Sequence, residues 1–360
     1  EPVFSYTAVN VGRVHQSSFM IGYSARRDGV GQFHLGLQKA RYRAEYRDAR
    51  TGTVTRQADD PLLYNASVMV PVADHLSAFA ATARGLEDSG AAPENAANRN
   101  EQLPASRSTQ YEAGLRWKGH GVQMLLSAFQ ITKPYFAFDT TRRYDLLGQV
   151  RHRGAEVSFS GHLAPRLSIV AGGVFMQPRV TGPGRDIVGA RPAGTPSVYA
   201  RIDANYRTDW LNGLTPTATL TYTGTRAAGS CAVPGPGCAQ LMLGGHTTLD
   251  LGLRERFRLA GHAASFRAIV SNVFDQQAWK VVAANTLQQD EVRRAQVTVS
   301  IRTGSVPRHR SWCAPAGGRN SDHTAPRGAS CPNCPTSPCR RPTTHGHSGT
   351  ARWWRRRAAR

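Results

Sequence analysis

Apolar and polar residues alternate one by one along many short stretches of the chain. Between 198 and 206 the even positions are all apolar, whereas the odd positions carry Tyr199, Arg201, Asp203 and Asn205. The same alternation covers 111–118, 217–223, 248–254 and 295–302. A period of two is that of a β-strand with one apolar and one polar face, so the pattern predicts an all-β protein.

Extending this pattern along the chain predicts thirteen strands, and a fourteenth over 3–10 is compatible with it. Many of them exceed the five or six residues usual in soluble proteins and match the roughly nine to eleven that cross a bilayer at a tilt. The predicted strands are 16–26, 32–46, 62–71, 75–86, 108–119, 121–138, 149–162, 166–178, 196–207, 215–225, 246–258, 263–275 and 291–302.

The predicted connections alternate between short and long. The short ones fall at 27–31, 72–74, 119–121, 163–165, 209–214 and 260–261, and the long ones at 47–61, 87–107, 179–195, 226–245 and 276–290. This rhythm is typical of transmembrane antiparallel up-and-down β-barrels, in which short turns are periplasmic and long loops extracellular. A half-solvated sheet of a soluble protein is the alternative, but strand length, strand number and loop rhythm would then coincide by chance.

Composition narrows the alternatives. The chain has a mean hydropathy of −0.41, and no apolar run approaches the roughly 18 to 20 residues of a membrane helix, which leaves the closed barrel as the structure that satisfies its backbone in lipid. The net charge of +21 invites a nucleic-acid interpretation. Between 303 and 360, however, eleven arginines and a single acid, Asp322, give +10, so about half of the excess lies in one sixth of the chain.

Several short motifs follow one another in order over roughly 60–302. They are Arg84-Gly85-Leu86-Glu87, Asn98, Leu103-Pro104, Ser108, Gln110-Tyr111-Glu112-Ala113-Gly114-Leu115, Phe129, Lys133-Pro134, Arg151-His152-Arg153-Gly154-Ala155-Glu156, Asn272-Val273-Phe274-Asp275 and Arg293-Arg294. Each motif is weak alone, but in this order and spacing they resemble the TonB-dependent siderophore receptors.

The resemblance implies an outer-membrane barrel that imports ferric siderophores or similar iron chelates, with energy from the TonB complex. In that family an N-terminal plug fills the barrel, and no plug is visible here. The chain would supply about 13 to 14 of the 22 strands of such plugged barrels. With no initiating Met and no secretory signal at Glu1, we expect a truncated chain over 1–302.

The segment 303–360 departs from the family pattern, because the last strand runs on past Arg302 without a terminal aromatic residue. It is rich in Pro, Gly, Ser and Arg, lacks periodicity and ends in Arg352-Trp353-Trp354-Arg355-Arg356-Arg357. Such a composition cannot bury a core and predicts disorder. One hypothesis is that this tail is translated out of frame. Its binding to nucleic acid or anionic lipid is a less favoured interpretation.

The cysteines raise two questions. Cys231 and Cys238 lie seven positions apart in a Gly/Pro-rich loop, and an oxidising cell surface favours a disulfide between them. Tail residues could be arranged as a zinc site because Cys-x2-Cys is an accepted ligand spacing, but no apolar residues flank them, and we predict no metal site. The tail residues are Cys313, Cys331, Cys334, Cys339, His345 and His347.

We expect neither catalysis nor a cofactor, since phosphate-loop, nucleophile-elbow and zinc-protease motifs are missing. The charged residues of the polar face are expected to line the lumen and to contact a plug. They are Glu112, Arg116, Glu156, Arg201, Asp203, Asp250 and Arg254.

Ligand recognition can be predicted only in outline. Aromatic residues toward the extracellular mouth could stack on a chelate, and neighbouring cations could attract its negative charge. The candidates are Tyr135, Phe136, Phe138, Tyr144, Trp279, Arg142, Arg143 and Lys280. For each residue taken singly, an aromatic girdle at the lipid interface is the preferred interpretation.

The sequence thus predicts a ferric-siderophore receptor of the bacterial outer membrane, with lipid and the TonB complex as partners and no nucleic acid. Its main rival is a passive diffusion porin. The rival from another class is a soluble, nucleic-acid-binding protein that acts through the basic tail.

Overall fold

The computed structural model describes residues 9–209, 213–283, 286–290 and 292–302. The chain divides into two units, Glu1–Gly304 and Ser305–Arg360, and the second lies outside the described residues. The predicted tail and its candidate zinc ligands therefore have no structural account. The same holds for most of the additional strand considered over 3–10.

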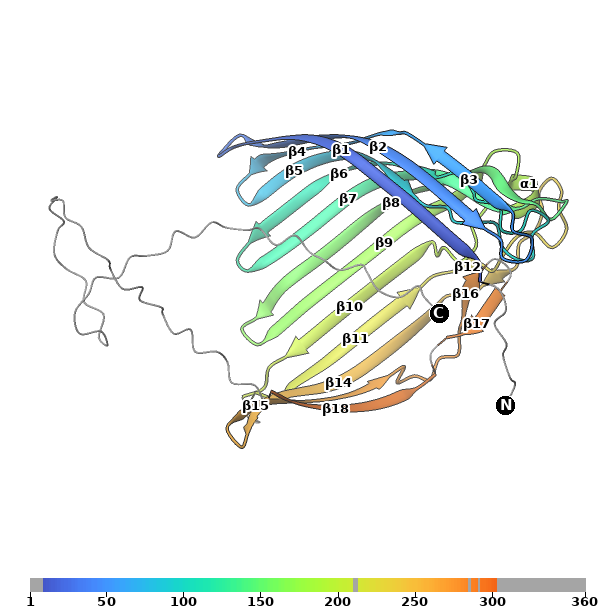
Figure 1. The fold of residues 1–360 in the computed structure, drawn as a ribbon. Helices are drawn as coiled ribbons and strands as arrows, with labels where there is room; N and C mark the ends of the chain where they lie inside the picture. The colour runs from blue at the N-terminus through green and yellow to red at the C-terminus, as the bar shows by residue number, and fades with distance from the viewer. Residues whose placement is uncertain (1–8, 210–212, 284–285, 291, 303–360) are drawn as a thin grey trace, which may run out of the picture. The chain divides into compact units, whose positions relative to one another are not determined.

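The first unit is dominated by one antiparallel sheet of 14 strands, in which each strand of the main path pairs with the next one in sequence (Figure 1). A short strand, β3 (Val54–Asp59), pairs with β2 beside this path. The path consists of β1 (Val11–Arg27), β2 (Gly31–Arg47), β4 (Leu62–Ala73), β5 (Leu76–Glu87), β6 (Ser106–Gly119), β7 (Val122–Phe138), β8 (Tyr144–Ala164), β9 (Leu167–Thr181), β10 (Val198–Tyr206), β11 (Thr215–Thr223), β14 (His246–Leu259), β15 (His262–Ser271) and β18 (Arg294–Arg302).

The sheet curls into a wall, and Figure 1 shows its strands running side by side at a common tilt. Within the described residues, β1 and β18 form the two edges and do not pair with each other. The predicted up-and-down β-barrel topology is confirmed, as an unclosed wall of a barrel. None of the helices in the described part of the chain is long and apolar enough to cross a membrane.

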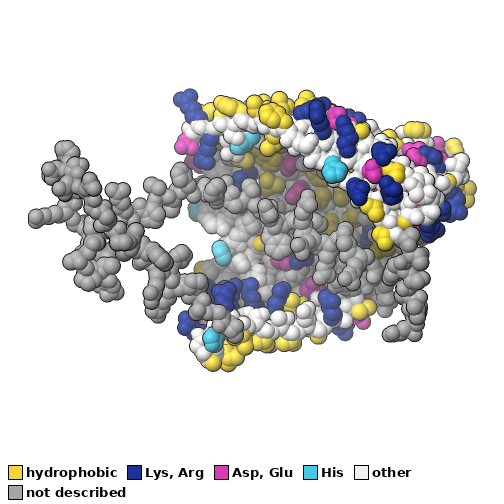
Figure 2. Space-filling model, viewed as in Figure 1, with side chains coloured by type: hydrophobic (Ala, Val, Ile, Leu, Met, Phe, Trp, Pro, Cys, Tyr) yellow, Lys and Arg dark blue, Asp and Glu magenta, His cyan; other side chains and the backbone are white. Residues whose placement is uncertain are grey.

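The two faces of the sheet follow the alternation in the sequence. On β8, Ala155, Val157 and Phe159 share one face, and the pairing register aligns Val157 with Leu126 of β7 and Gly173 of β9. The opposite face carries all seven charged residues predicted to line a lumen. Figure 2 shows apolar side chains along the outer rim of the wall, so the apolar face is convex and the polar face concave.

Five of the short connections are tight hairpin turns of two or three residues. Two of them place both central residues at positive φ: His120 and Gly121 at 51° and 74°, and Ala260 and Gly261 at 50° and 82°. Turns of this kind match the right-handed twist of the strands they join. The short turns gather at one end of the wall and the long connections at the other (Figure 1).

Strand β8 begins earlier than the alternation predicts, at Tyr144 rather than 149. The register between β7 and β8 shifts by one residue between Tyr135 and Phe136, which is a bulge on β8. Above the bulge the alternation of β8 is out of phase, so a search for a period of two does not extend the strand to Tyr144. Gly148 permits the bulge, because its φ is 149° and a Cβ there would lie 2.2 Å from the carbonyl oxygen of Thr181.

Short elements within the long connections were not predicted, because few residues carry their pattern. Besides β3, these are the hairpin strands β12 (Arg226–Ala227) and β13 (Met242–Leu243), the hairpin strands β16 (Trp279–Ala283) and β17 (Thr286–Gln289), and the helix α1 (Arg185–Val188).

Candidate functional site

At the long-loop end of the wall, buried apolar side chains form two clusters. In the first, Ala92, Ala96 and Leu103 of the β5–β6 connection pack against Phe136, Phe138 and Tyr144. The rings of Phe138 and Tyr144 meet edge to face, with centroids 5.1 Å apart. These aromatic residues thus anchor the connection 88–105 to β7 and β8.

The second cluster contains Tyr135. Successive side chains on a strand point to opposite faces, so Tyr135 and Ala137 lie on the other side of β7 from Phe136 and Phe138. They pack with Val180 of β9 and with Ile187 and Val188 of α1. This cluster fixes the β9–β10 connection to the wall.

Asn98 secures the β5–β6 connection through the backbone of Tyr144. Its Nδ2 donates to the carbonyl oxygen of Tyr144 at 3.0 Å, and its Oδ1 accepts from the backbone N–H of the same residue at 2.8 Å. Such a paired contact satisfies both backbone groups at the start of a strand. The motif position Asn98 therefore has a structural role.

Charged candidates reinforce this contact. Arg143 forms an ion pair with Glu101 at 2.8 Å, and Arg142 Nη2 lies 3.5 Å from the carbonyl oxygen of Asn95. Asp139 shapes the turn between β7 and β8. The Thr141 hydroxyl, together with backbone N–H groups of the turn, holds the pKa of Asp139 below its ordinary value.

A buried polar pair lies beneath the same connection. Asn100 Nδ2 donates to Asp48 Oδ2 at 2.6 Å, and the backbone N–H groups of Arg50 and Thr51 donate to Asp48 Oδ1. The hydrogen bond from Asn100 is the largest cause that lowers the pKa of Asp48 to about 2. This pair was missed in the sequence, where isolated Asp and Asn residues in a loop give no signal of burial.

Trp279 and Lys280 lie elsewhere, at the start of β16. The Trp279 side chain is 54% exposed, and its carbonyl oxygen accepts a hydrogen bond from the buried Arg226 guanidinium. Lys280 Nζ lies 3.8 Å from a carboxylate oxygen of Asp290.

The structure joins Cys231 and Cys238 in a disulfide, with Cα atoms 5.8 Å apart. Next to it, Gln240 ties two connections together. Its Oε1 accepts from the backbone N–H of Arg191, and its Nε2 lies 2.9 Å from the carbonyl oxygen of Gly229. The loop end is therefore cross-linked by both covalent and polar contacts.

Taken together, the structure gathers the predicted ligand residues in three places. Phe136, Phe138, Arg142, Arg143 and Tyr144 surround the β5–β6 connection, Tyr135 lies in the second cluster, and Trp279 and Lys280 lie on the β16–β17 hairpin. In the described part of the chain, no hydrogen bond or ring contact connects the hairpin pair to the other two places. Nor do three His, Cys, Asp or Glu side chains gather there as metal ligands.

Comparison with known proteins identifies the family to which this β-barrel wall belongs. The family model described as TonB dependent receptor-like, beta-barrel, matches residues 16–273. A curated relative, the ferrichrome receptor FcuA of Yersinia enterocolitica, is 25% identical over 205 residues, which cover 56% of this chain and 26% of the relative.

Solved structures agree in fold. BauA, the ferric preacinetobactin receptor from Acinetobacter baumannii, superposes with a TM-score of 0.67 at 23% identity and covers 84% of this chain and 45% of that one. FyuA, the ferric yersiniabactin uptake receptor from Yersinia pestis, gives 0.64 at 17% identity, with 81% and 46% covered. The chain spans about a quarter of the curated relative and less than half of these structures. With the family model matching most of its strands, the chain belongs to the TonB-dependent receptor β-barrels of the bacterial outer membrane.

Proposed function

We propose that the protein containing this chain imports a ferric siderophore across the outer membrane, driven by the TonB complex. The observation that carries the proposal is the family barrel over residues 16–273. Its similarity to a ferrichrome receptor and to ferric-siderophore receptors supports an iron chelate as the substrate class. The proposal involves binding and transport, without a covalent step.

The β16–β17 hairpin is the best-placed candidate contact for the chelate. Trp279 presents an exposed indole, whereas Lys280, the next residue of the strand, points to the other face and lies 3.8 Å from a carboxylate oxygen of Asp290. An exposed aromatic face suits a flat group of a ligand. By contrast, Phe138 and Tyr144 are already engaged with the β5–β6 connection, so we propose a positioning role for them.

The test is iron-limited growth and uptake of labelled ferric chelates in a bacterial host whose own siderophore receptors are deleted. We expect uptake of one chelate class, hydroxamate, catecholate or carboxylate. The Trp279→Ala variant should raise the apparent KM several-fold at an unchanged surface level. The matched control is Trp117→Ala, at the short-turn end of β6, which should leave the KM unchanged.

Energy dependence separates this proposal from its porin rival. Deleting the host's TonB should abolish uptake by a receptor, because the energised step is lost. Uptake that continues at the same rate without TonB would overturn the proposal and favour passive diffusion.

A further inference from the structure

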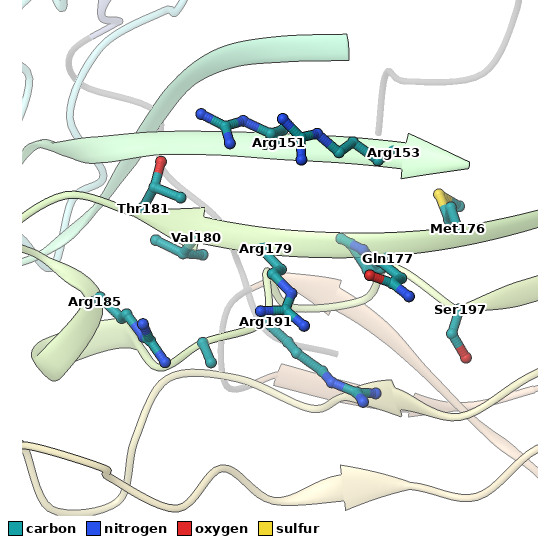
Figure 3. Close-up of a pocket in the computed structure, with 12 residues that line it drawn as sticks. Arg151, Arg153, Met176, Gln177, Arg179, Val180, Thr181, Arg185, Arg191 and Ser197 are labelled. Atoms are coloured by element: carbon teal, nitrogen blue, oxygen red, sulfur yellow. The ribbon is translucent and has the colours of Figure 1, made fainter. Parts of the chain in front are cut away.

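Five arginines line a hollow of about 760 Å³ at the long-loop end of the wall (Figure 3). They come from three consecutive segments, β8, β9 and the β9–β10 connection, and Figure 3 shows Arg179 and Arg191 directed into the same space. The five are Arg151, Arg153, Arg179, Arg185 and Arg191.

The strand register determines the face of the three arginines that lie on strands, Arg151, Arg153 and Arg179. Arg151 and Arg153 continue the series Phe159, Val157 and Ala155, the lipid-facing side of β8. Arg179 likewise continues the series on β9 that ends at Phe175. The arginines on these two strands therefore begin where the apolar band ends, on the extracellular side.

The charges of this cluster are uncompensated by protein. Arg151 and Arg179 are directly paired across β8 and β9, an arrangement in which like charges on one face destabilise the sheet. Within the described residues, none of the five forms an ion pair with a carboxylate, and the buried Nε of Arg151 has no hydrogen-bond partner. Arg153 Nε donates to Gln130 Oε1 at 2.6 Å, which is a neutral partner.

Two arginines elsewhere on the same face have acidic partners. On β2, Arg43 forms an ion pair with Asp60 at 2.7 Å, and on β6 Arg107 forms one with Asp59 at 3.5 Å. The arginines of the hollow lack such partners among the described residues.

We propose that this hollow binds the phosphate-bearing headgroup of an anionic lipid in the outer leaflet. Guanidinium groups bind phosphate oxygens through paired N–H donors, and their aliphatic stems can lie along the adjoining apolar surface. Because the hollow opens beside the lipid-contacting band, a headgroup reaches it while its acyl chains lie against Phe175 and its neighbours. The inference rests on the position of the wall in the membrane and not on the identity of the transported chelate.

Native mass spectrometry of the full chain in dodecylmaltoside tests the proposal, with phosphatidylglycerol as the probe and phosphatidylcholine as the uncharged comparison. The test variant combines R151Q, R153Q and R179Q. A surface arginine contributes about 1 kcal/mol to anionic-lipid binding, so losing three should lower the phosphatidylglycerol affinity by about 100-fold. Phosphatidylcholine binding should not change.

The matched control combines R254Q, R256Q and R258Q, which removes the same charge from the concave face of β14. It should shift the affinity by less than about twofold. Equal losses in both variants, or equal wild-type affinity for the two lipids, would overturn the proposal. Displacement of the lipid by inorganic phosphate at comparable concentration would also overturn it, since the hollow would then be a site for soluble anions.

Heat-modifiable migration on electrophoresis reports whether each variant has folded. If the triple variant does not fold, the exposed positions are tested singly. R153Q and R179Q should then each lower the phosphatidylglycerol affinity about fivefold, and no change in either would refute the headgroup site.

Discussion

Two adjacent leucines on β7 give a direct test of the assignment of the two faces. Leu126 pairs with Leu115 and Val157 in the middle of the apolar band, and its side chain is 54% exposed on the lipid-facing side. Leu125 pairs with Arg116 and Ser158 on the opposite, polar face. The same substitution, Leu→Arg, therefore places one charge in lipid and the other in the lumen.

The magnitudes separate the two variants. An arginine at the bilayer midplane on the lipid face of a barrel costs about 2 to 4 kcal/mol, which lowers the folding equilibrium constant by roughly 30- to 1,000-fold. Leu125→Arg avoids this cost, although the new charge lies opposite Arg116. That like-charge pair costs at most about 1 kcal/mol.

The assay is urea titration of both variants refolded into phosphatidylcholine vesicles, followed by tryptophan fluorescence and by heat-modifiable migration. We expect Leu126→Arg to lose at least twice as much free energy of unfolding as Leu125→Arg. Equal losses, or a larger loss at Leu125, would refute the face assignment and with it the membrane-spanning orientation of β7.

Two further predictions concern the loop end. The pKa of Asp48 in the folded chain is about 2, below the ordinary 3.8. The stability that ionised Asp48 gives through its hydrogen bond with Asn100 is therefore fully present above pH 3.8 and is lost as the pH falls toward 2. Pepsin should cleave 88–105 more slowly in wild type than in Asp48→Asn at pH 4, but at similar rates at pH 2; a constant difference would contradict this. Removing the disulfide by Cys231→Ser with Cys238→Ser should destabilise its loop by about 2 to 3 kcal/mol, from the chain entropy of so short a ring. Limited proteolysis within 226–245 should then quicken by at least tenfold, and unchanged cleavage would count against the cross-link.

The sequence predicts which residues lie on each face of the wall, because apolar and polar residues alternate with a period of two along the strands. All seven charges assigned to the lumen lie on the concave face, and most strand ends agree within a few residues. The pattern fails where the phase changes. At Leu146-Leu147-Gly148 two apolar residues and a glycine interrupt the alternation, so the pattern predicts a connection where the structure has the upper part of β8.

The site was harder to predict, because its contacts join residues that are distant in sequence. Asn98 and Tyr144 are 46 positions apart, and Asp48 and Asn100 are 52 apart. A loop sequence carries no periodic signal of what it packs against. Aromatic residues could be placed near the extracellular end, but not assigned between packing and ligand contact. Of the arginines of the β8–β9 hollow, only Arg151 and Arg153 belong to a sequence motif, because the grouping of all five depends on the fold.

The bulge at the top of β8 also limits sliding between strands. A shift of two residues between neighbouring strands keeps every side chain on its own face, so the apolar pattern alone opposes such a slip only weakly. Such a shift would place a residue other than Gly148 against the carbonyl oxygen of Thr181. Only Gly148 fits against the carbonyl oxygen of Thr181, and any other residue brought to that point would clash with β9. Together with Gly154, whose Cβ would lie 2.3 Å from the carbonyl oxygen of Phe175, this glycine fixes the vertical alignment of β8 and β9, and with it the height of the arginines above the lipid.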